Sequence, residues 1–95
     1  MENQFPVPGR ISVYVTDTNN VLSRLLQVFG KSRFEVTYMQ VFNTDDADLK
    51  LIIVEALFPK DMMALILERI EKIIEVQRAI AHLEEEKDIA AVANG

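Results

Sequence analysis

Residues able to act as acids, bases or metal ligands are few in this chain. His82 is the only histidine, and nothing in the pattern supplies the orienting carboxylate and pocket that general acid–base catalysis needs. The adjacent acids Asp45 and Asp46 are typical of a turn, and the run Glu84–Glu86 is typical of a solvated surface. The absence of cysteine excludes disulfides, thiolate metal sites and thiol nucleophiles. We therefore expect no catalytic residue, no metal site and no cofactor.

The segment Asp17-Thr18-Asn19-Asn20 is the most informative part of the sequence. It lies between a predicted strand and a predicted helix, and its residue types favour turns and helix N-caps. A helix N-terminus has unpaired backbone N–H groups and a partial positive charge, which attract carboxylates. The same residues suit simple helix capping without a ligand, so the pattern leaves both interpretations open.

The elements that position this segment follow from hydrophobic periodicity. Alternation over 11–16 predicts a half-buried strand, and apolar residues at three- and four-residue intervals from Val21 to Phe29 predict a helix that ends at Gly30 and the polar run 31–33. The first ten residues, with two prolines and a glycine, are expected to form a loose arm.

The next predicted elements are two strands joined by a short turn. Residues 34–44 predict a strand that turns at 43–46 into a second strand, 49–58, which is apolar enough to be covered on both faces. The alternation in the first of these strands places one set of side chains on a single face: Phe34, Val36, Tyr38, Gln40 and Phe42.

A second helix and a last strand complete the predicted order. Asp61 is expected to cap a helix with apolar positions from Met62 to Ile73, and residues 75–82 predict the last strand. Strand, helix, strand, strand, helix, strand is the order of an α+β ferredoxin-like sandwich, βαββαβ, with a four-stranded antiparallel sheet and two helices on one face. We expect the arm at 1–10, the domain at 11–83 and an acidic, then alanine-rich tail at 84–95.

Charge and hydropathy narrow the classes of partner. The chain of 95 residues has ten Lys and Arg against fifteen Asp and Glu, a net charge of −5, which disfavours nucleic acid and anionic membrane surfaces. No apolar run is long enough for a membrane span, and the first residues lack the order of a signal peptide. A cytoplasmic protein with a protein or small-molecule partner is the expectation.

The segment from Asp17 to Leu25, followed by Val28-Phe29 and Phe34-Glu35-Val36, resembles the start of an ACT domain. The continuation Leu22-Ser23-Arg24 and the turn Asn43-Thr44-Asp45-Asp46 are most similar to the small regulatory subunit of acetolactate synthase. This resemblance covers about residues 10 to 83. The family has Gly where Asn20 stands and Asn where Asp17 and Glu35 stand.

The resemblance implies a non-catalytic regulatory protein. Such a protein forms a homodimer with its sheets side by side and binds valine, leucine or isoleucine at the interface. It then modulates the catalytic (large) subunit of a thiamine-diphosphate-dependent enzyme of branched-chain amino-acid biosynthesis. The expected ligand-binding residues are Asp17, Thr18, Asn19, Asn20 and Val21, with Glu35 altering specificity.

Two other functions remain open at this level. The departures at Asn20 and Glu35 are compatible with a protein–protein interaction module of the same fold that has lost effector binding. A small enzyme on this fold, such as an acylphosphatase, needs a phosphate-binding arginine in a glycine-rich loop or a catalytic group in a closed pocket, and neither can be assembled from these residues.

Overall fold

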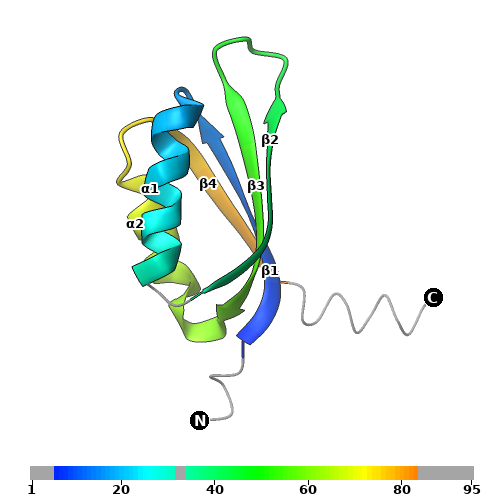
Figure 1. Cartoon of the computed structure of the whole chain (residues 1–95), viewed down its shortest axis with the longest axis vertical. Coiled ribbons are helices and arrows are strands. Elements are labelled where there is room, and N and C mark those ends of the chain that lie inside the picture. Colours follow the sequence, from blue (N-terminus) through cyan, green and yellow to red (C-terminus); the bar gives the residue numbers. More distant parts are fainter. Residues whose placement is uncertain (1–5, 32–33, 84–95) are drawn as a thin grey trace, which may run out of the picture.

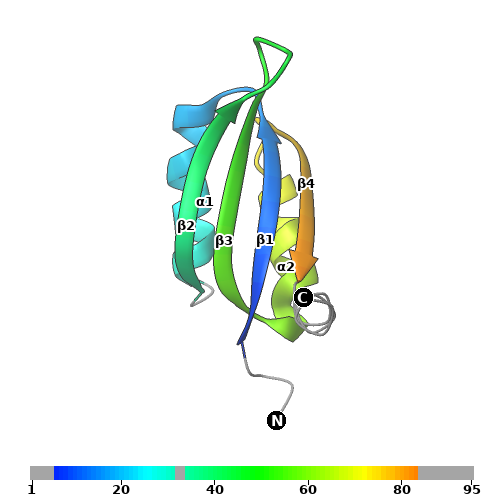
Figure 2. The same ribbon diagram turned by 90° about the vertical axis from the view of Figure 1, so that its right-hand side faces the viewer.

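The computed structural model describes residues 6–31 and 34–83. Its elements are β1 (Pro6–Val15), α1 (Thr18–Lys31), β2 (Glu35–Asn43), β3 (Lys50–Pro59), the short 3₁₀ turn η2 (Lys60–Met62), α2 (Met63–Glu71) and β4 (Val76–Leu83). The strands pair antiparallel in the order β2-β3-β1-β4. Both helices cover the same face of this sheet (Figures 1 and 2). The predicted ferredoxin-like βαββαβ fold is confirmed.

Strand β1 begins earlier than predicted. Residues 6–10 are part of the sheet and not of an arm, with Pro6 paired to Pro59 and Pro8 to Leu57 of β3. The ladder between β1 and β4 begins only at Gly9, opposite Leu83. Because both prolines precede that ladder, their missing N–H groups leave no bond to β4 unmade, which explains how a proline-rich segment can be a strand. Residues 1–5 and the predicted tail 84–95 lie outside the described residues.

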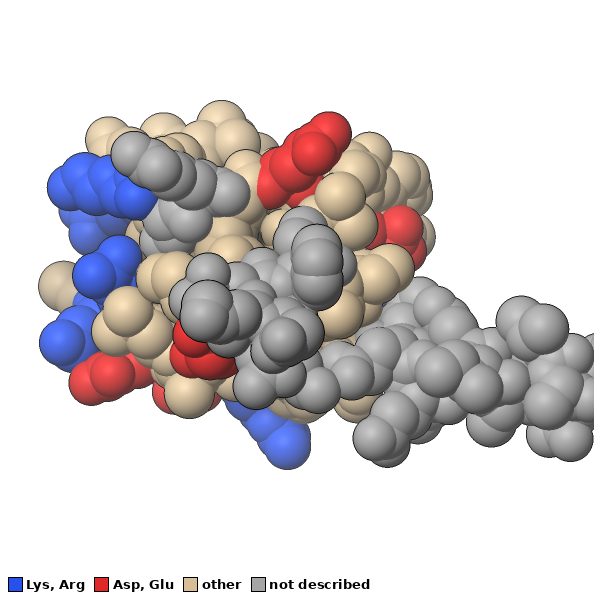
Figure 3. Space-filling model, turned by 90° about the horizontal axis from the view of Figure 1, so that it is seen from below, with Lys and Arg blue, Asp and Glu red and all other residues tan. Residues whose placement is uncertain are grey.

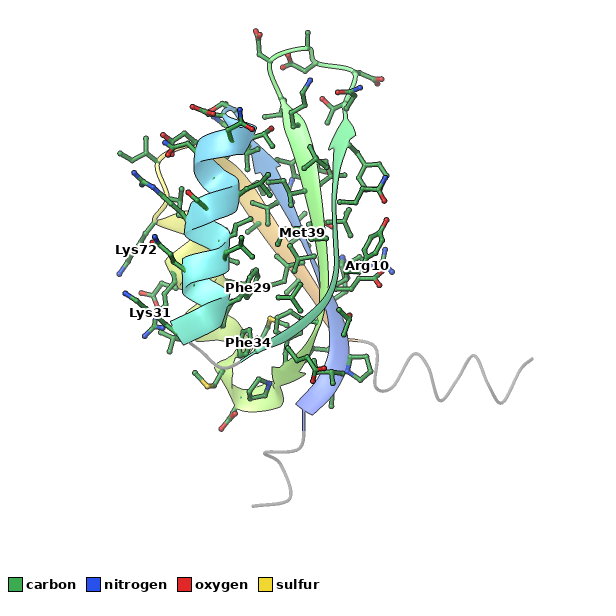
Figure 4. All side chains as sticks on the ribbon, in the orientation of Figure 1. Arg10, Phe29, Lys31, Phe34, Met39 and Lys72 are labelled. Atoms are coloured by element: carbon green, nitrogen blue, oxygen red, sulfur yellow. The ribbon has the colours of Figure 1, made fainter. Side chains whose placement is uncertain are left out.

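Strand β2 contains a bulge that the alternation pattern did not predict. Val36 pairs with Ala56 and Tyr38 with Glu55, so Thr37 is the extra residue. The bulge reverses the alternation. Phe34 and Val36 contact the core from the helix side, as does Met39 after the bulge (Figure 4), whereas Tyr38 is on the open face. The prediction that Phe34, Val36, Tyr38, Gln40 and Phe42 share one face is therefore wrong.

The start of α2 also differs from the prediction. Asp61 lies inside η2, and Met62 occupies the N-cap position with no side-chain hydrogen bond to the helix. Pro59 ends β3 and the chain makes one 3₁₀ turn before the α-helix begins, which moves the helix start two residues beyond Asp61. Asp61 is therefore not the predicted cap.

The hydrophobic core lies between the sheet and the helix layer. Alternate residues of the two central strands are fully buried beneath the helices, among them Ile11, Val13, Ile52 and Val54. Phe29 of α1, Phe34 and Phe58 of β3 form an aromatic cluster, in which the Phe34 and Phe58 rings meet edge to face with centroids 4.9 Å apart. This cluster ties the end of α1 to the sheet.

The opposite face of the sheet is covered by no element among the described residues. Leu51, Ile53 and Leu57 of β3 are half-buried there, and Arg10 also points to this side (Figure 4). The prediction that this strand is covered on both faces is correct only for the helix side.

Candidate functional site

The connection from β1 to α1 is fixed by the turn that precedes β4. Both the backbone N–H and the hydroxyl of Thr16 donate to the carbonyl oxygen of Glu75, at 3.0 and 3.3 Å. Because β1 and β4 are neighbours in the sheet, this contact joins segments that are 59 residues apart in sequence. The segment Asp17–Asn20 therefore starts from a fixed point at one end of the sheet.

Asp17 caps α1. Its Oδ1 accepts a hydrogen bond from the N–H of Asn20 at 3.4 Å, and its carbonyl oxygen accepts the N–H of Val21 at 3.1 Å. These are the contacts of an N-cap residue, and the capping interpretation is confirmed. The N–H groups of Thr18 and Asn19, in the first turn, have no acceptor within the helix, since the first N–H groups of any helix precede its hydrogen-bonding ladder.

Asn20 connects the first turn of α1 to Glu75. Its Nδ2 donates to Glu75 Oε2 at 2.9 Å, and its carbonyl oxygen accepts the hydroxyl of Ser23 at 3.1 Å. The other carboxylate oxygen, Glu75 Oε1, is buried without a hydrogen-bond partner. An unpaired buried carboxylate oxygen is costly, because it has lost its hydration with no donor in exchange. This oxygen is an unused acceptor beside the helix N-terminus.

Glu75 was not among the residues predicted from the sequence. It lies in the turn before β4, remote from the Asp17–Asn20 segment in sequence, and it matches no local motif. The one signal that could have found it is topological: in a ferredoxin-like sheet the last strand pairs with the first, so the residue before the last strand meets the residue after the first.

Two of the predicted site residues are placed differently from the rest. The Val21 side chain is fully buried in the core. Glu35 pairs with Leu57, near the start of β1, whereas Val15, at the end of β1, is level with Lys50 and Asn43. Glu35 is therefore at the opposite end of the sheet from Asp17–Asn20, and one copy of the chain does not bring them together.

The other chemical candidates have structural roles. His82 is exposed on β4, as predicted. Asp46 and Thr44 organise the turn between β2 and β3, where Asp46 Oδ1 accepts the N–H of Asp48 at 2.9 Å and Thr44 Oγ1 accepts the N–H of Asp46 at 3.1 Å. Within residues 6–31 and 34–83, no three His, Cys, Asp or Glu side chains are grouped so that they could hold a metal ion. The run Glu84–Glu86 is outside these residues.

The fold and the capped helix start define a ferredoxin-like domain with polar groups gathered where β1 meets α1. The profile of the ACT domain family matches residues 17–79, and the chain belongs to this family. ACT domains are typically regulatory, ligand-binding domains. A sequence comparison with curated proteins found no match.

Solved structures of low sequence identity share the fold. The ACT domain from GTP pyrophosphokinase of Chlorobium tepidum is 13% identical with a TM-score of 0.66, covering 81% of this chain and 99% of that one. The C-terminal domain of the MgtC protein from Mycobacterium tuberculosis is 9% identical with a TM-score of 0.71, covering 84% and 88%.

A third similar structure is a whole enzyme. A homoserine dehydrogenase from Thiobacillus denitrificans is 11% identical with a TM-score of 0.70, covering 85% of this chain but only 18% of that enzyme. At these identities the likeness concerns the fold alone. In the part of the chain that the structure describes, no helix has the length and apolar character needed to cross a membrane.

Proposed function

We propose that the protein is a regulatory subunit that binds an amino acid at the start of α1 and controls a catalytic partner. The observation that carries this proposal is the charge arrangement at that point. The N–H groups of Thr18 and Asn19 can receive a carboxylate, and the carboxylates of Asp17 and Glu75 lie beside them. A zwitterion, with one carboxylate and one ammonium group, is complementary to both.

The active form is a homodimer joined along β2. This strand forms one edge of the sheet, so its outer N–H and C=O groups are free to pair with another strand. We assign to this interface an apolar flank of Leu22 and Leu26 of α1 with Met39 and Val41 of β2, of which Leu22 and Met39 also pack against the core. Leu26 is 56% exposed and Val41 36%, and removing their side chains from water would favour association.

A two-fold axis perpendicular to the sheet, beside the outer edge of β2, explains how Glu35 can join the site. Antiparallel pairing of two β2 strands places the start of one beside the end of the other. The end of β2 is level with the end of β1, where the Asp17–Asn20 segment begins. Glu35 of the partner subunit then approaches the N-terminus of α1, where its carboxylate favours the ammonium end of the ligand.

The partner and effector follow from the resemblance to the acetolactate synthase small subunit. The partner is the catalytic subunit of a thiamine-diphosphate-dependent enzyme, and the effector is valine, leucine or isoleucine. Thermal unfolding of the purified chain with each amino acid tests the binding step. A ligand at 100 times its Kd stabilises by about 2.7 kcal/mol, and each kcal/mol raises the Tm by roughly 4–8 °C for a domain of this size.

The alternative function is a protein–protein interaction module without an effector. The hydrogen bond from Asn20 Nδ2 to Glu75 Oε2 favours it, because this side chain occupies space at the helix start and ties up one of the acceptors. An Asn20→Gly, Glu35→Asn double variant distinguishes the two functions. If only the double variant gains a Tm shift with branched-chain amino acids, the native protein is the module; a shift in the native protein excludes the module.

A further inference from the structure

A cationic groove runs between the two helices, on the side away from the sheet. It has a volume of about 610 Å³ and is lined by Arg24, Gln27, Val28, Lys31, Arg69 and Ile73. Three of these residues are cations and none is an acid. Figure 3 shows Lys and Arg side chains gathered at this side of the molecule, and Figure 4 shows Lys72 and Lys31 on the outer side of the helix layer.

The charge of the groove is opposite to that of the chain. The whole chain has a net charge of −5, yet α1 contains no acidic residue and has Arg24 and Lys31 as its charged side chains. The acids of α2, Glu68 and Glu71, do not line the groove. Guanidinium groups bind carboxylates through bidentate hydrogen bonds. A groove lined by cations and a few apolar residues therefore fits an acidic segment that also has some apolar side chains.

We propose that the groove is the docking site of the chain's own C-terminal segment, residues 84–95. The segment begins Glu84-Glu85-Glu86-Lys87-Asp88, four acids and one base, and continues with Ile89-Ala90-Ala91-Val92-Ala93. Its acidic part complements Arg24 and Lys31, the two cations that α1 contributes to the groove. Its apolar part complements Val28, which is half-buried and lines the same groove.

The segment begins at the correct end of the molecule. Leu83 is opposite Gly9, and the side chains of Leu83 and Phe58 both come within 2.9 Å of the point where a Cβ on Gly9 would lie. The Phe58 ring is 6.5 Å from that of Phe29, two residues before Lys31. The end of β4 and the end of α1 therefore both lie near Phe58, at the same end of the sheet.

The length of the acidic part of the segment also agrees with the spacing of the cations along α1. An extended chain advances about 3.3 Å per residue, so the acidic part from 84 to 88 spans about 13 Å. A helix advances about 1.5 Å per residue, so the cations at 24 and 31 are about 10 Å apart along α1. The inference goes beyond the proposed function and does not rest on it, because neither the effector nor the β2 edge is part of the groove.

Paramagnetic relaxation in the full chain tests this docking. The chain has no cysteine, so Ala91→Cys provides a single attachment point for a nitroxide. We expect strong broadening of the backbone amide signals of Gln27, Val28 and Lys31 at low salt. The broadening should disappear in 1 M NaCl, where the Debye length is about 3 Å. A nitroxide on Ala47→Cys, in the turn between β2 and β3, is the matched control and should leave these signals sharp.

Charge variants separate docking from chance proximity. Glu84→Gln, Glu85→Gln and Glu86→Gln together should remove the broadening, and so should Arg24→Gln with Lys31→Gln, whose side chains are exposed and outside the core. No broadening in the native chain, or equal broadening in both sets of variants, overturns the proposal. Broadening found only when labelled and unlabelled chains are mixed assigns the groove to a second copy and also overturns it.

Discussion

Asn20 has a measurable role as the side chain that pairs Glu75. Asn20→Ala removes the donor to Glu75 Oε2, while Oε1 is already without a partner. We expect the free energy of unfolding to fall by about 1 kcal/mol, less than the roughly 1.5–3 kcal/mol typical of a hydrogen bond to a charged group, because this pair is exposed. Urea unfolding of the native chain and the variant measures the difference.

Asn19→Ala is the matched control for this prediction. It makes the same change of residue type one position earlier in the exposed first turn of α1, so it reports the effect of helix propensity alone. In a Glu75→Ala background, Asn20→Ala should have no larger effect than Asn19→Ala, since the partner is already gone. An Asn20→Ala variant as stable as Asn19→Ala in the native background would contradict the pairing.

At the scale of residues, the sequence predicted the roles that depend on neighbours along the chain, such as the helix cap. Asp17 as a cap follows from its residue type and its position before an apolar helix pattern. The role of Glu75 could not be predicted in this way, because its contact depends on β4 lying beside β1 and not on neighbours in sequence. The position of Glu35 at the far end of the sheet likewise depends on strand register.

Among the elements, the two glycines at positions 9 and 30 should respond oppositely to alanine. A Cβ on Gly9 would lie 2.9 Å from side-chain atoms of Leu83 and of the fully buried Phe58, and 3.1 Å from the carbonyl oxygen of His82. We expect Gly9→Ala to destabilise the domain by about 1–3 kcal/mol, because the aromatic cluster holds Phe58 in place.

Gly30 lies inside α1, and a Cβ at this position would have open space around it, with no atom within 4 Å beyond the adjacent helix backbone. Gly30→Ala should therefore stabilise the domain by about 0.5–1 kcal/mol, since alanine loses less backbone entropy in a helix. Thermal unfolding of the two variants checks both signs. A stabilised Gly9→Ala variant would contradict the tight packing around Gly9, and a destabilised Gly30→Ala variant would contradict the open space around Gly30.

Element boundaries show where periodicity stops being informative. Helix α1 and the strands were found from their periods, but β2 has apolar or aromatic residues in both phases of the alternation, so its sequence does not show which phase faces the core. One extra residue at Thr37 decides that question, and its position is fixed by pairing with β3. A bulge of this kind leaves little trace in a single sequence.

For the whole molecule, the dimer along β2 makes a prediction about solution mass. Leu26→Glu puts a charge into the apolar flank, and because Leu26 is 56% exposed the monomer fold should tolerate it. We expect sedimentation velocity to show a dimer for the native chain and a monomer for Leu26→Glu. Ile74→Glu, at a site 87% exposed in the turn before β4, is the control and should remain dimeric.

A native chain that sediments as a monomer would contradict the dimer, and a Leu26→Glu dimer would place the interface elsewhere.

The element order of the whole molecule was predictable from the sequence, because the change of hydrophobic period from two to 3.6 marks each strand and helix. The open face of the sheet was not predictable from the sequence. The apolar run in β3 indicates burial on both faces of the strand, whereas elements among the described residues cover only one face.

The central position of β1 has a consequence for how the chain acquires its structure. Ile11 pairs with Val54 on one side and with Ala81 on the other, so the first strand of the domain is completed only by the last strand of the domain. During translation one hydrogen-bonding edge of β1 has no partner strand until residues 76–83 have emerged. Such distant pairings slow folding and prolong exposure of strand edges. A nascent chain that stalls before β4 should therefore depend on chaperones, although most of its core residues have already been made.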